Sequence, residues 1–223
     1  MSELPEVVVE LPGWELVWFE LETTDDPAAA ERLAAFRARQ AAALRSRWTA
    51  AELGEDATVA ALRRLFRAPG TDPTRYRPSS EALLRRLLKG EELAPIHPLV
   101  DLNNALSIEL RVPACVLAVG SFSFPVTLAA GRAGEILDSM RGPLDLAGKP
   151  FLADAEGPFG SPITDSHRVK VRPETRRAWL VAYLPVGGPA AGEVAARLAA
   201  ILAEAPVARR LGARPPAGGD AAS

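Results

Sequence analysis

The sequence predicts an α/β domain in which a helical half precedes a half made mainly of sheet. Alanine-rich stretches with apolar residues at helical spacing occupy residues 26–110. Short β-branched runs separated by Gly and Pro occupy residues 113–185, and a last periodic segment at 189–205 predicts a closing helix. A chain of 223 residues, 48% of them hydrophobic, can bury one core, so we expect a single domain over residues 1–211.

The first elements are expected to be two short strands. Residues 7–11 and 14–19 are apolar runs rich in Val, Leu and Trp, and Pro12-Gly13 between them is a turn signal. Sheet formation is therefore predicted to begin at the start of the chain.

Two helices are predicted next. Asp26-Pro27 combines a capping residue with a proline in the first turn, and the Ala-rich helix that follows runs to about residue 48. A second helix near residues 58–66 repeats the apolar spacing. The Pro- and Gly-rich stretch at 68–78 is too irregular for a helix or strand and predicts a loop.

Two further helices complete the first half. Ser79-Ser80-Glu81 is expected to cap a helix that ends at Lys89-Gly90, where a basic last turn precedes a glycine. The next helix spans residues 98–110. In the second half, strands are predicted at residues 114–119, 125–129, 169–171 and 177–184, and the tail at 212–223 (GARPPAGGDAAS) is predicted to be disordered.

The composition excludes several classes of protein. No apolar stretch approaches the roughly 20 residues of a membrane span, and the acidic start MSELPEVVVE does not resemble a secretory signal, so we expect a cytoplasmic protein. One Cys and two His supply few soft ligands, so no metal and no other cofactor are expected. The sequence leaves the oligomeric state open.

Charge is distributed unevenly along the chain. Residues 1–31 carry nine acidic groups and no Lys or Arg, whereas residues 37–89 carry twelve basic and five acidic groups, a net charge of +7. The basic stretch is either a surface that faces phosphates or a set of solvated helix faces.

Two polar clusters interrupt apolar sequence. In residues 98–107, Asp101, Asn104 and Ser107 share one helix face. Polar side chains in this position form either a hydrogen-bond network in the core or a binding site. In residues 157–168, Asp165 and Ser166 end a Gly- and Pro-rich segment.

A hydrolytic triad is not expected in the second cluster. In an extended segment Asp165 and His167 face one way and Ser166 faces the other. Cys115 lies in an apolar run and is interpreted as a buried hydrophobe rather than a nucleophile. His97 and His167 are too few to indicate a metal site.

Three segments together resemble one family. Residues 76–90 (YRPSSEALLRRLLKG), 97–113 (HPLVDLNNALSIELRVP) and 157–185 (GPFGSPITDSHRVKVRPETRRAWLVAYLP) are similar to the free-standing B3/B4 domain proteins. These resemble the B3/B4 region of the phenylalanyl-tRNA synthetase β chain, which hydrolyses tyrosine wrongly attached to the phenylalanine tRNA. The resemblance covers roughly residues 60–190 and implies a β-sandwich of unusual topology flanked by helices.

The resemblance also implies a set of site residues. One departure from the family is the stretch ACVLAVGSF after Pro113, where many members carry a run that contains aspartates. This chain is therefore expected to prefer a more apolar group or to have lost the activity. The family's recurring polar residues fall on Arg77, Ser80, Glu81, Asp101, Asn104, Ser107, Gly134, Glu135, Asp154, Asp165, Ser166, Arg168 and Thr175.

Two functions are compatible with these residues. The first is an aminoacyl-tRNA deacylase acting in trans, in which Asp165 holds or activates a water and Asn104 and Ser107 contact the substrate amine or carbonyl. The partner of this deacylase would be tRNA. Arg77 and Arg168 would bind phosphate or ribose oxygens. The full set of residues expected to contact the substrate or the RNA is Arg77, Ser80, Glu81, Ser166 and Arg168.

The second function is a non-catalytic module that binds RNA or an amino-acid-like ligand. It needs the same fold but no general base. A third, weaker hypothesis is a structural protein that binds a partner through the apolar face of residues 194–202.

Overall fold

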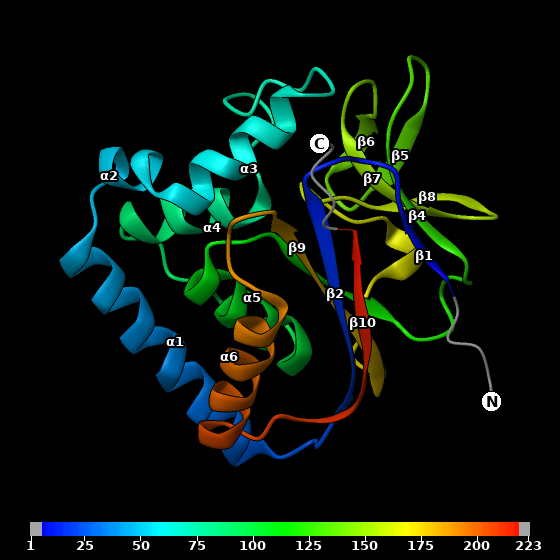
Figure 1. The fold of residues 1–223 in the computed structure, drawn as a ribbon. Coiled ribbons are helices and arrows are strands. Elements are labelled where there is room, and N and C mark those ends of the chain that lie inside the picture. Colours follow the sequence, from blue (N-terminus) through cyan, green and yellow to red (C-terminus); the bar gives the residue numbers. More distant parts are fainter. Residues whose placement is uncertain (1–5, 219–223) are drawn as a thin grey trace.

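The computed structural model describes residues 6–218 and contains two four-stranded sheets that pack face to face. Helices cover the outer face of one sheet, so the molecule has three layers (Figure 1). This is the helix-flanked β-sandwich that the resemblance implied. Among the described residues, no helix has the length and apolar character needed to cross a membrane. The same part of the chain contains no group of three or more His, Cys, Asp or Glu side chains placed to hold a metal ion.

The helical layer contains the five predicted helices in order, together with one short helix, Ala50–Glu55, that was not predicted. Asp26 caps the first helix by accepting a hydrogen bond from the Ala28 backbone N–H. Ser79 and Ser80 do not cap the fourth, because the cap residue is Pro78 and both serines lie in the first turn. The helices are α1 (Pro27–Arg47), α2 (Ala50–Glu55), α3 (Ala57–Arg67), α4 (Ser79–Leu88), α5 (Pro98–Leu110) and α6 (Ala191–Glu204).

The central sheet has the strand order β10-β2-β9-β3, with antiparallel neighbours throughout. Alternation along β2 explains its central place: Leu16 and Trp18 pack against the second sheet, whereas Val17 and Phe19 pack against the helices. A strand that is apolar on both faces must lie between two layers. The bounds are β10 (Ala208–Gly218), β2 (Trp14–Thr23), β9 (Arg177–Pro185) and β3 (Ala114–Ala118).

The second sheet has the order β1-β4-β7-β8. Although β1 and β2 are separated by only a turn, β1 pairs in parallel with β4 and so belongs to this sheet rather than to that of β2. The bounds are β1 (Val7–Val9), β4 (Val126–Ala130), β7 (Pro150–Asp154) and β8 (Gly157–Gly160), and the hairpin β5 (Ile136–Ser139) and β6 (Gly142–Asp145) stands beside them.

Two further sequence-based assignments are wrong. Residues 169–171 do not form the predicted strand. A short 3-10 turn spans His167–Val169, because the Ser166 hydroxyl accepts the Arg168 backbone N–H and starts the turn, and residues 170–171 have no regular structure. The predicted disordered tail is a strand up to Gly218, where β10 pairs with β2 and a register shift spans the two prolines. Residues 219–223 lie outside the described part of the chain.

Candidate functional site

A cleft of about 300 Å³, here called the Asp165 cleft, lies between α4, α5, β3 and the loop that follows β8. Asn103 and Asn104 line it from α5, and Asp165 lines it from the loop. The Ser79 backbone N–H donates to the Pro162 carbonyl at 2.8 Å, which ties the start of α4 to this loop. Residues of both predicted polar clusters therefore meet at one cavity.

The α5 wall presents two adjacent amides. Leu102 and Leu106 are buried in the core between α5 and the central sheet, which fixes the rotation of the helix. Asn103, only 6% exposed, donates from Nδ2 to the Ala114 carbonyl at 3.1 Å, and its Oδ1 is buried without a hydrogen-bond partner in the described residues. Asn104 is half-buried and lines the same cleft.

The carboxyl group of Asp165 has a raised pKa. Burial raises the pKa of Asp165 from 3.8 to about 7, although the Ser161 backbone N–H and the charge of Arg141 act in the opposite direction. Its Oδ1 is buried and has no hydrogen-bond partner in the described residues. The group is therefore poised to exchange a proton near neutral pH.

Two neighbours of Asp165 stay protonated. The Cys115 Sγ lies 3.7 Å from the Tyr183 hydroxyl in the core beneath the cleft. Burial, together with the negative charge of Asp165, raises the pKa of both the Cys115 thiol and the Tyr183 phenol well above their ordinary values. Neither group can act as a nucleophile by ionising at neutral pH, which agrees with the interpretation of Cys115 as a buried hydrophobe.

A basic groove of about 410 Å³ continues from the Asp165 cleft. Arg86, Arg141 and Ile163 line both cavities. Within the described residues that line the groove there are six cations and no carboxylate. The six cations are Arg75, Arg77, Arg85, Arg86, Lys89 and Arg141.

Three cations of the basic groove form no ion pair with a carboxylate of the described residues. Arg85 pairs with Glu81 at 2.7 Å and Arg86 pairs with Glu91 at 2.7 Å. Within the described chain the remaining ion pairs do not involve Arg75, Lys89 or Arg141. These three side chains are therefore the ones available to an anion. The Tyr76 ring lies among them, with the Arg75 guanidinium 5.2 Å and the Lys149 amino group 4.2 Å from its centroid.

Glu81 lies inside the helical layer rather than at the cleft. Its fully buried carboxylate accepts hydrogen bonds from Arg63 at 2.5 and 2.9 Å and from Arg85 at 2.7 Å. Burial opposes ionisation, but these hydrogen bonds outweigh it and hold the pKa of Glu81 below its ordinary value. Ser80 is also fully buried, whereas the half-exposed Arg77 lines the basic groove.

Ser107 and Arg168 are engaged in structural contacts. The Ser107 hydroxyl donates to the Val112 carbonyl at 2.7 Å, across the turn where Arg111 adopts a φ of 59°, and Ser107 lines a smaller neighbouring pocket of about 140 Å³. The Arg168 guanidinium binds both carboxylate oxygens of Asp154 at 2.9 and 3.0 Å and also contacts Glu156. Arg168 therefore clamps the β7–β8 hairpin and does not line the Asp165 cleft.

The other positions implied by the resemblance also support the fold. Asp101 pairs with Arg37 at 2.8 Å, and burial raises the pKa of Asp101 despite this charge. Glu135 follows Gly134 in the turn before β5 and accepts the Arg132 backbone N–H at 2.5 Å. The hydroxyls of Ser166 and Thr175 each accept a backbone N–H within their own loops.

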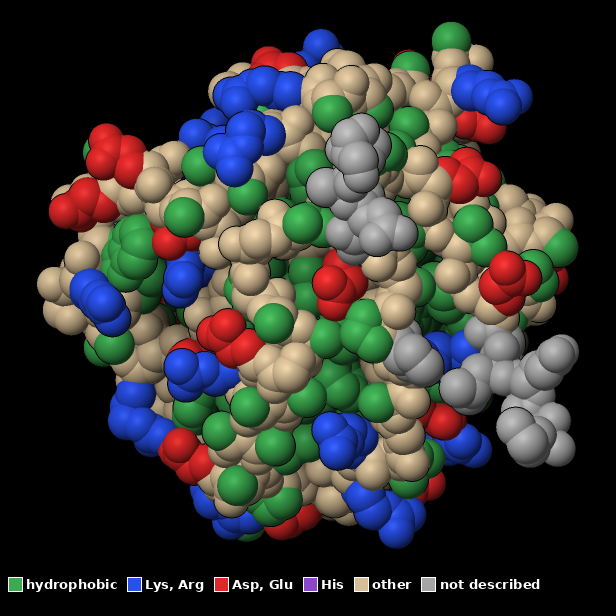
Figure 2. Space-filling model, in the orientation of Figure 1, with side chains coloured by type: hydrophobic (Ala, Val, Ile, Leu, Met, Phe, Trp, Pro, Cys, Tyr) green, Lys and Arg blue, Asp and Glu red, His purple; other side chains and the backbone are tan. Residues whose placement is uncertain are grey.

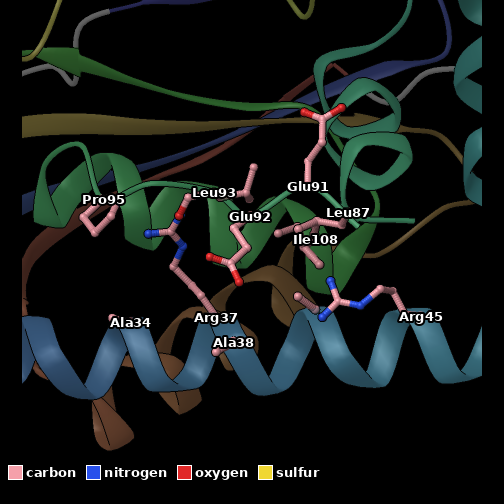
Figure 3. Close-up of a pocket in the computed structure, with 11 residues that line it drawn as sticks. Ala34, Arg37, Ala38, Arg45, Leu87, Glu91, Glu92, Leu93, Pro95 and Ile108 are labelled. Carbon is pink, nitrogen blue, oxygen red and sulfur yellow. The ribbon is translucent and has the colours of Figure 1, made fainter. Parts of the chain in front are cut away.

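A separate cleft of about 250 Å³ lies between α1 and residues 91–95 (Figure 3). Arg37 extends from α1 toward this segment and donates to the Leu93 carbonyl at 3.0 Å, while Glu92 points toward α1 and Glu91 points away from it. No residue that lines this cleft also lines the Asp165 cleft. It contains none of the predicted site residues, so the candidate site is the Asp165 cleft.

Acidic and basic side chains are interspersed on the face of the molecule seen in Figure 2. Sheet pairing is one cause, since Glu20 and Glu22 of β2 form ion pairs with Arg177 of β9 and Arg209 of β10. The acidic start of the chain is thus partly neutralised by arginines that are distant in sequence.

Sequence reasoning missed two residues of the site. Arg141 comes from the turn between β5 and β6 and lines the Asp165 cleft, the basic groove and the small pocket between them. Its surroundings in sequence, Met140-Arg141-Gly142, give no functional signal. Asn103 lies in the polar stretch at residues 98–107, but the sequence interpretation selected the helix face of Asp101 and Ser107, which carries Asn104.

Comparison with known proteins gives a family and one related structure. The family model described as "B3/4 domain" matches residues 61–187. No curated protein matches. A similar solved structure is an N-terminal fragment of the phenylalanyl-tRNA synthetase β-subunit from Pyrococcus horikoshii, at 12% sequence identity and a TM-score of 0.45. The match covers 94% of this chain and 50% of that one, so the chain spans about half the length of the fragment.

Proposed function

The chain belongs to the B3/4 domain family, and from that membership we propose that it hydrolyses, in trans, the ester that joins an amino acid to tRNA. One observation carries the proposal. Asp165, a carboxyl group whose pKa burial raises to about 7, lines the same cleft as the amides of α5, and this cleft shares Arg86, Arg141 and Ile163 with the basic groove. A carboxylate, an amide donor and a phosphate-binding surface are the parts that such a reaction needs.

The chemistry requires only a positioned water. Asp165 in its ionised form accepts a proton from the water as the water oxygen attacks the ester carbonyl. In this proposal the Asn104 amide, which lines the same cleft, donates a hydrogen bond to the oxyanion that forms. When the bond from carbon to the ribose oxygen breaks, Asp165 returns the proton to that oxygen, so the products are a free amino acid and uncharged tRNA.

The basic groove is the proposed site for the RNA backbone. Arg75, Lys89 and Arg141 line this groove, and none of them forms an ion pair with a carboxylate in the described part of the chain. Binding of phosphates to such cations releases counterions, which makes the affinity depend strongly on salt. Tyr76 holds the Arg75 guanidinium and the Lys149 ammonium over its ring, which places two positive charges beside the groove.

The walls of the Asp165 cleft disfavour an amino acid with a cationic side chain. Val100, Val116, Ile163 and Val171 line it with the cations Arg86, Arg141 and Lys170, and Asp165 is the one carboxylate among its described lining residues. Burial of a cationic substrate side chain beside like charges is costly.

The alternative of a non-catalytic module also has an observation in its favour. Ser107, one of the three predicted catalytic residues, donates its hydroxyl to Val112 and lies outside the Asp165 cleft. A module of this kind would keep the basic groove and bind RNA without turnover.

A panel of correctly and wrongly charged tRNAs separates the two functions. The proposal expects the pure protein to accelerate ester loss from at least one of them, and Asp165→Asn to lose about 100-fold or more of that activity while tRNA affinity is unchanged. Asp138→Asn is the matched control, because Asp138 is exposed on β5 and does not line the cleft. Salt-dependent tRNA binding without any ester loss would favour the module instead.

A further inference from the structure

Asn103 holds a buried hydrogen-bond acceptor at the wall of the Asp165 cleft. The residue is 6% exposed, lines the cleft, and has an Oδ1 with no hydrogen-bond partner in the described part of the chain. A buried polar atom without a partner is destabilising, so its retention at a cavity wall indicates a ligand donor.

The orientation of this amide is fixed by its neighbour. The Ala114 carbonyl can only accept a hydrogen bond, so the group 3.1 Å from it must be the Nδ2 of Asn103. The opposite assignment would place two acceptors against each other. Oδ1 is therefore the atom that remains to be satisfied, and it can be satisfied only by a donor.

The position of Asn103 relates it to the ester. Asn103 is adjacent in sequence to Asn104, which is proposed at the ester carbonyl, and both line the cleft. In every aminoacyl ester the α-ammonium group is one carbon away from that carbonyl. Val100 and Val116 are apolar residues of the same lining, whose charged groups are Asp165, Arg86, Arg141 and Lys170.

We infer that Asn103 is a specificity-determining residue whose Oδ1 accepts a hydrogen bond from the α-ammonium group of the aminoacyl ester. This inference rests on the proposed function. It defines the substrate class as esters of amino acids with a free α-amino group, and it excludes esters of N-acylated amino acids and of peptides. Asp165 remains the group that accepts the proton from water.

The test compares esters that differ only at the α position. The aminoacyl-tRNA that the protein hydrolyses fastest is paired with its counterpart in which hydrogen replaces the amino group, which removes the donor without adding bulk. Each rate is divided by the spontaneous rate of the same ester. The parent protein should prefer the free amine in kcat/KM by about tenfold to hundredfold, the effect of one charge-assisted hydrogen bond.

Two substitutions separate recognition from a structural role. Asn103→Leu removes the acceptor and the bond to Ala114, whereas Asn103→Asp retains an acceptor and loses the same bond to Ala114. The preference for the free amine should fall to within about threefold of unity in Asn103→Leu and persist in Asn103→Asp. Equal loss in both variants would show that Asn103 only holds Ala114. If the variants lose activity only toward amino acids that carry a side-chain hydroxyl, Oδ1 binds the side chain of the substrate instead of its α-ammonium group. That result would also overturn the inference.

Binding distinguishes failure of the inference from failure of the proposed function. The probe is 3′-amino-3′-deoxyadenosine joined through an amide to leucine, which cannot be hydrolysed as an ester, and its counterpart without the α-amino group. Turnover without a preference for the amine would refute the role of Asn103 and leave the hydrolase intact. Selective binding of the amine-bearing probe without turnover of any ester would refute the hydrolase and retain the role. Binding of neither probe together with no turnover would refute both.

Discussion

Asn104 of α5 and Asp165 of the loop after β8 line the same cleft. Packing of α5 on the central sheet sets the position of the amide. The carboxylate is set by the backbone, since the Asp165 carbonyl accepts the Met140 N–H at 2.9 Å and the Ser166 N–H donates to Phe159 at 2.8 Å. Helix packing thus positions the amide, and backbone hydrogen bonds of its loop position the carboxylate.

Asp165→Asn is expected to stabilise the protein at neutral and alkaline pH. The pKa of Asp165 is raised in the folded state to about 7, so stability is highest where the group is protonated in both states and falls as pH rises from about 4 to about 7. Above pH 7 the variant should exceed the parent by at most about 4 kcal/mol, and at pH 4 the two should be equal. Urea unfolding of both proteins across this range measures the difference. A difference that does not change with pH would contradict the raised pKa.

Glu81→Gln is expected to destabilise the fold by about 3 kcal/mol, because it leaves Arg63 and Arg85 without their buried partner. The pKa of Glu81 is lowered in the folded state, so this stabilisation is present above its ordinary value and is lost as pH falls through the folded pKa. Denaturant unfolding at pH 7 and in acid measures both effects. The matched control is Glu91→Gln, whose exposed pair with Arg86 should contribute less than about 1 kcal/mol. Equal losses of unfolding free energy in the two variants would show that the buried pair and the exposed pair contribute alike, which would contradict the prediction.

Arg141→Gln is expected to weaken tRNA binding and to reduce its salt dependence. Loss of one phosphate contact should lower the slope of log affinity against log salt by about 0.7 to 0.9. Lys89→Gln should do the same, and Arg197→Gln, which removes an exposed charge on α6 that lines neither cavity, should change the slope little. Affinities measured at several salt concentrations decide this. Similar slopes for all four proteins would remove the basic groove from RNA binding.

Ser107→Ala is expected to affect stability rather than catalysis. The Val112 carbonyl would lose a buried hydrogen bond, at a cost of about 1 to 2 kcal/mol. The rate of ester loss per folded molecule should stay within about twofold of the parent. Thermal unfolding and hydrolysis assays on the same sample measure both, and a large loss of rate in a fully folded variant would restore a catalytic role to Ser107.

The helices could be predicted because their signals are local. Capping by Asp26, the apolar spacing of α3 and the glycine after Lys89 all act within a few residues. Sheet membership could not, because pairing depends on distant partners. The turn Pro12-Gly13 looks the same whether β1 and β2 pair with each other or enter different sheets, and only β4 and β9 decide it. The residues after 211 were predicted to be a disordered tail because β2, the strand that pairs with them, is almost 200 positions away in the sequence.

The candidate site could be predicted only in part, because a local sequence signal shows that a residue needs a partner but not which partner it has. Asn104 and Asp165 are polar residues within apolar sequence, and both line the cleft. Glu81 and Arg168 carry the same signal, but their partners Arg63 and Asp154 make them structural. A polar residue in an apolar segment indicates a partner, and the sequence does not reveal whether this partner is protein or substrate. Arg141 had no signal because tertiary structure alone brings the β5–β6 turn to the cleft.

The most direct test of the proposed hydrolysis is the pH dependence of ester loss, corrected for the spontaneous reaction at each pH. Because Asp165 must be ionised to accept a proton and its pKa is about 7, the rate with the parent protein should rise as pH increases and level off above pH 7. Asp165→Asn should abolish this component while the variant still binds tRNA. A rate that shows no inflection near pH 7, or that is unchanged in Asp165→Asn, would contradict the account.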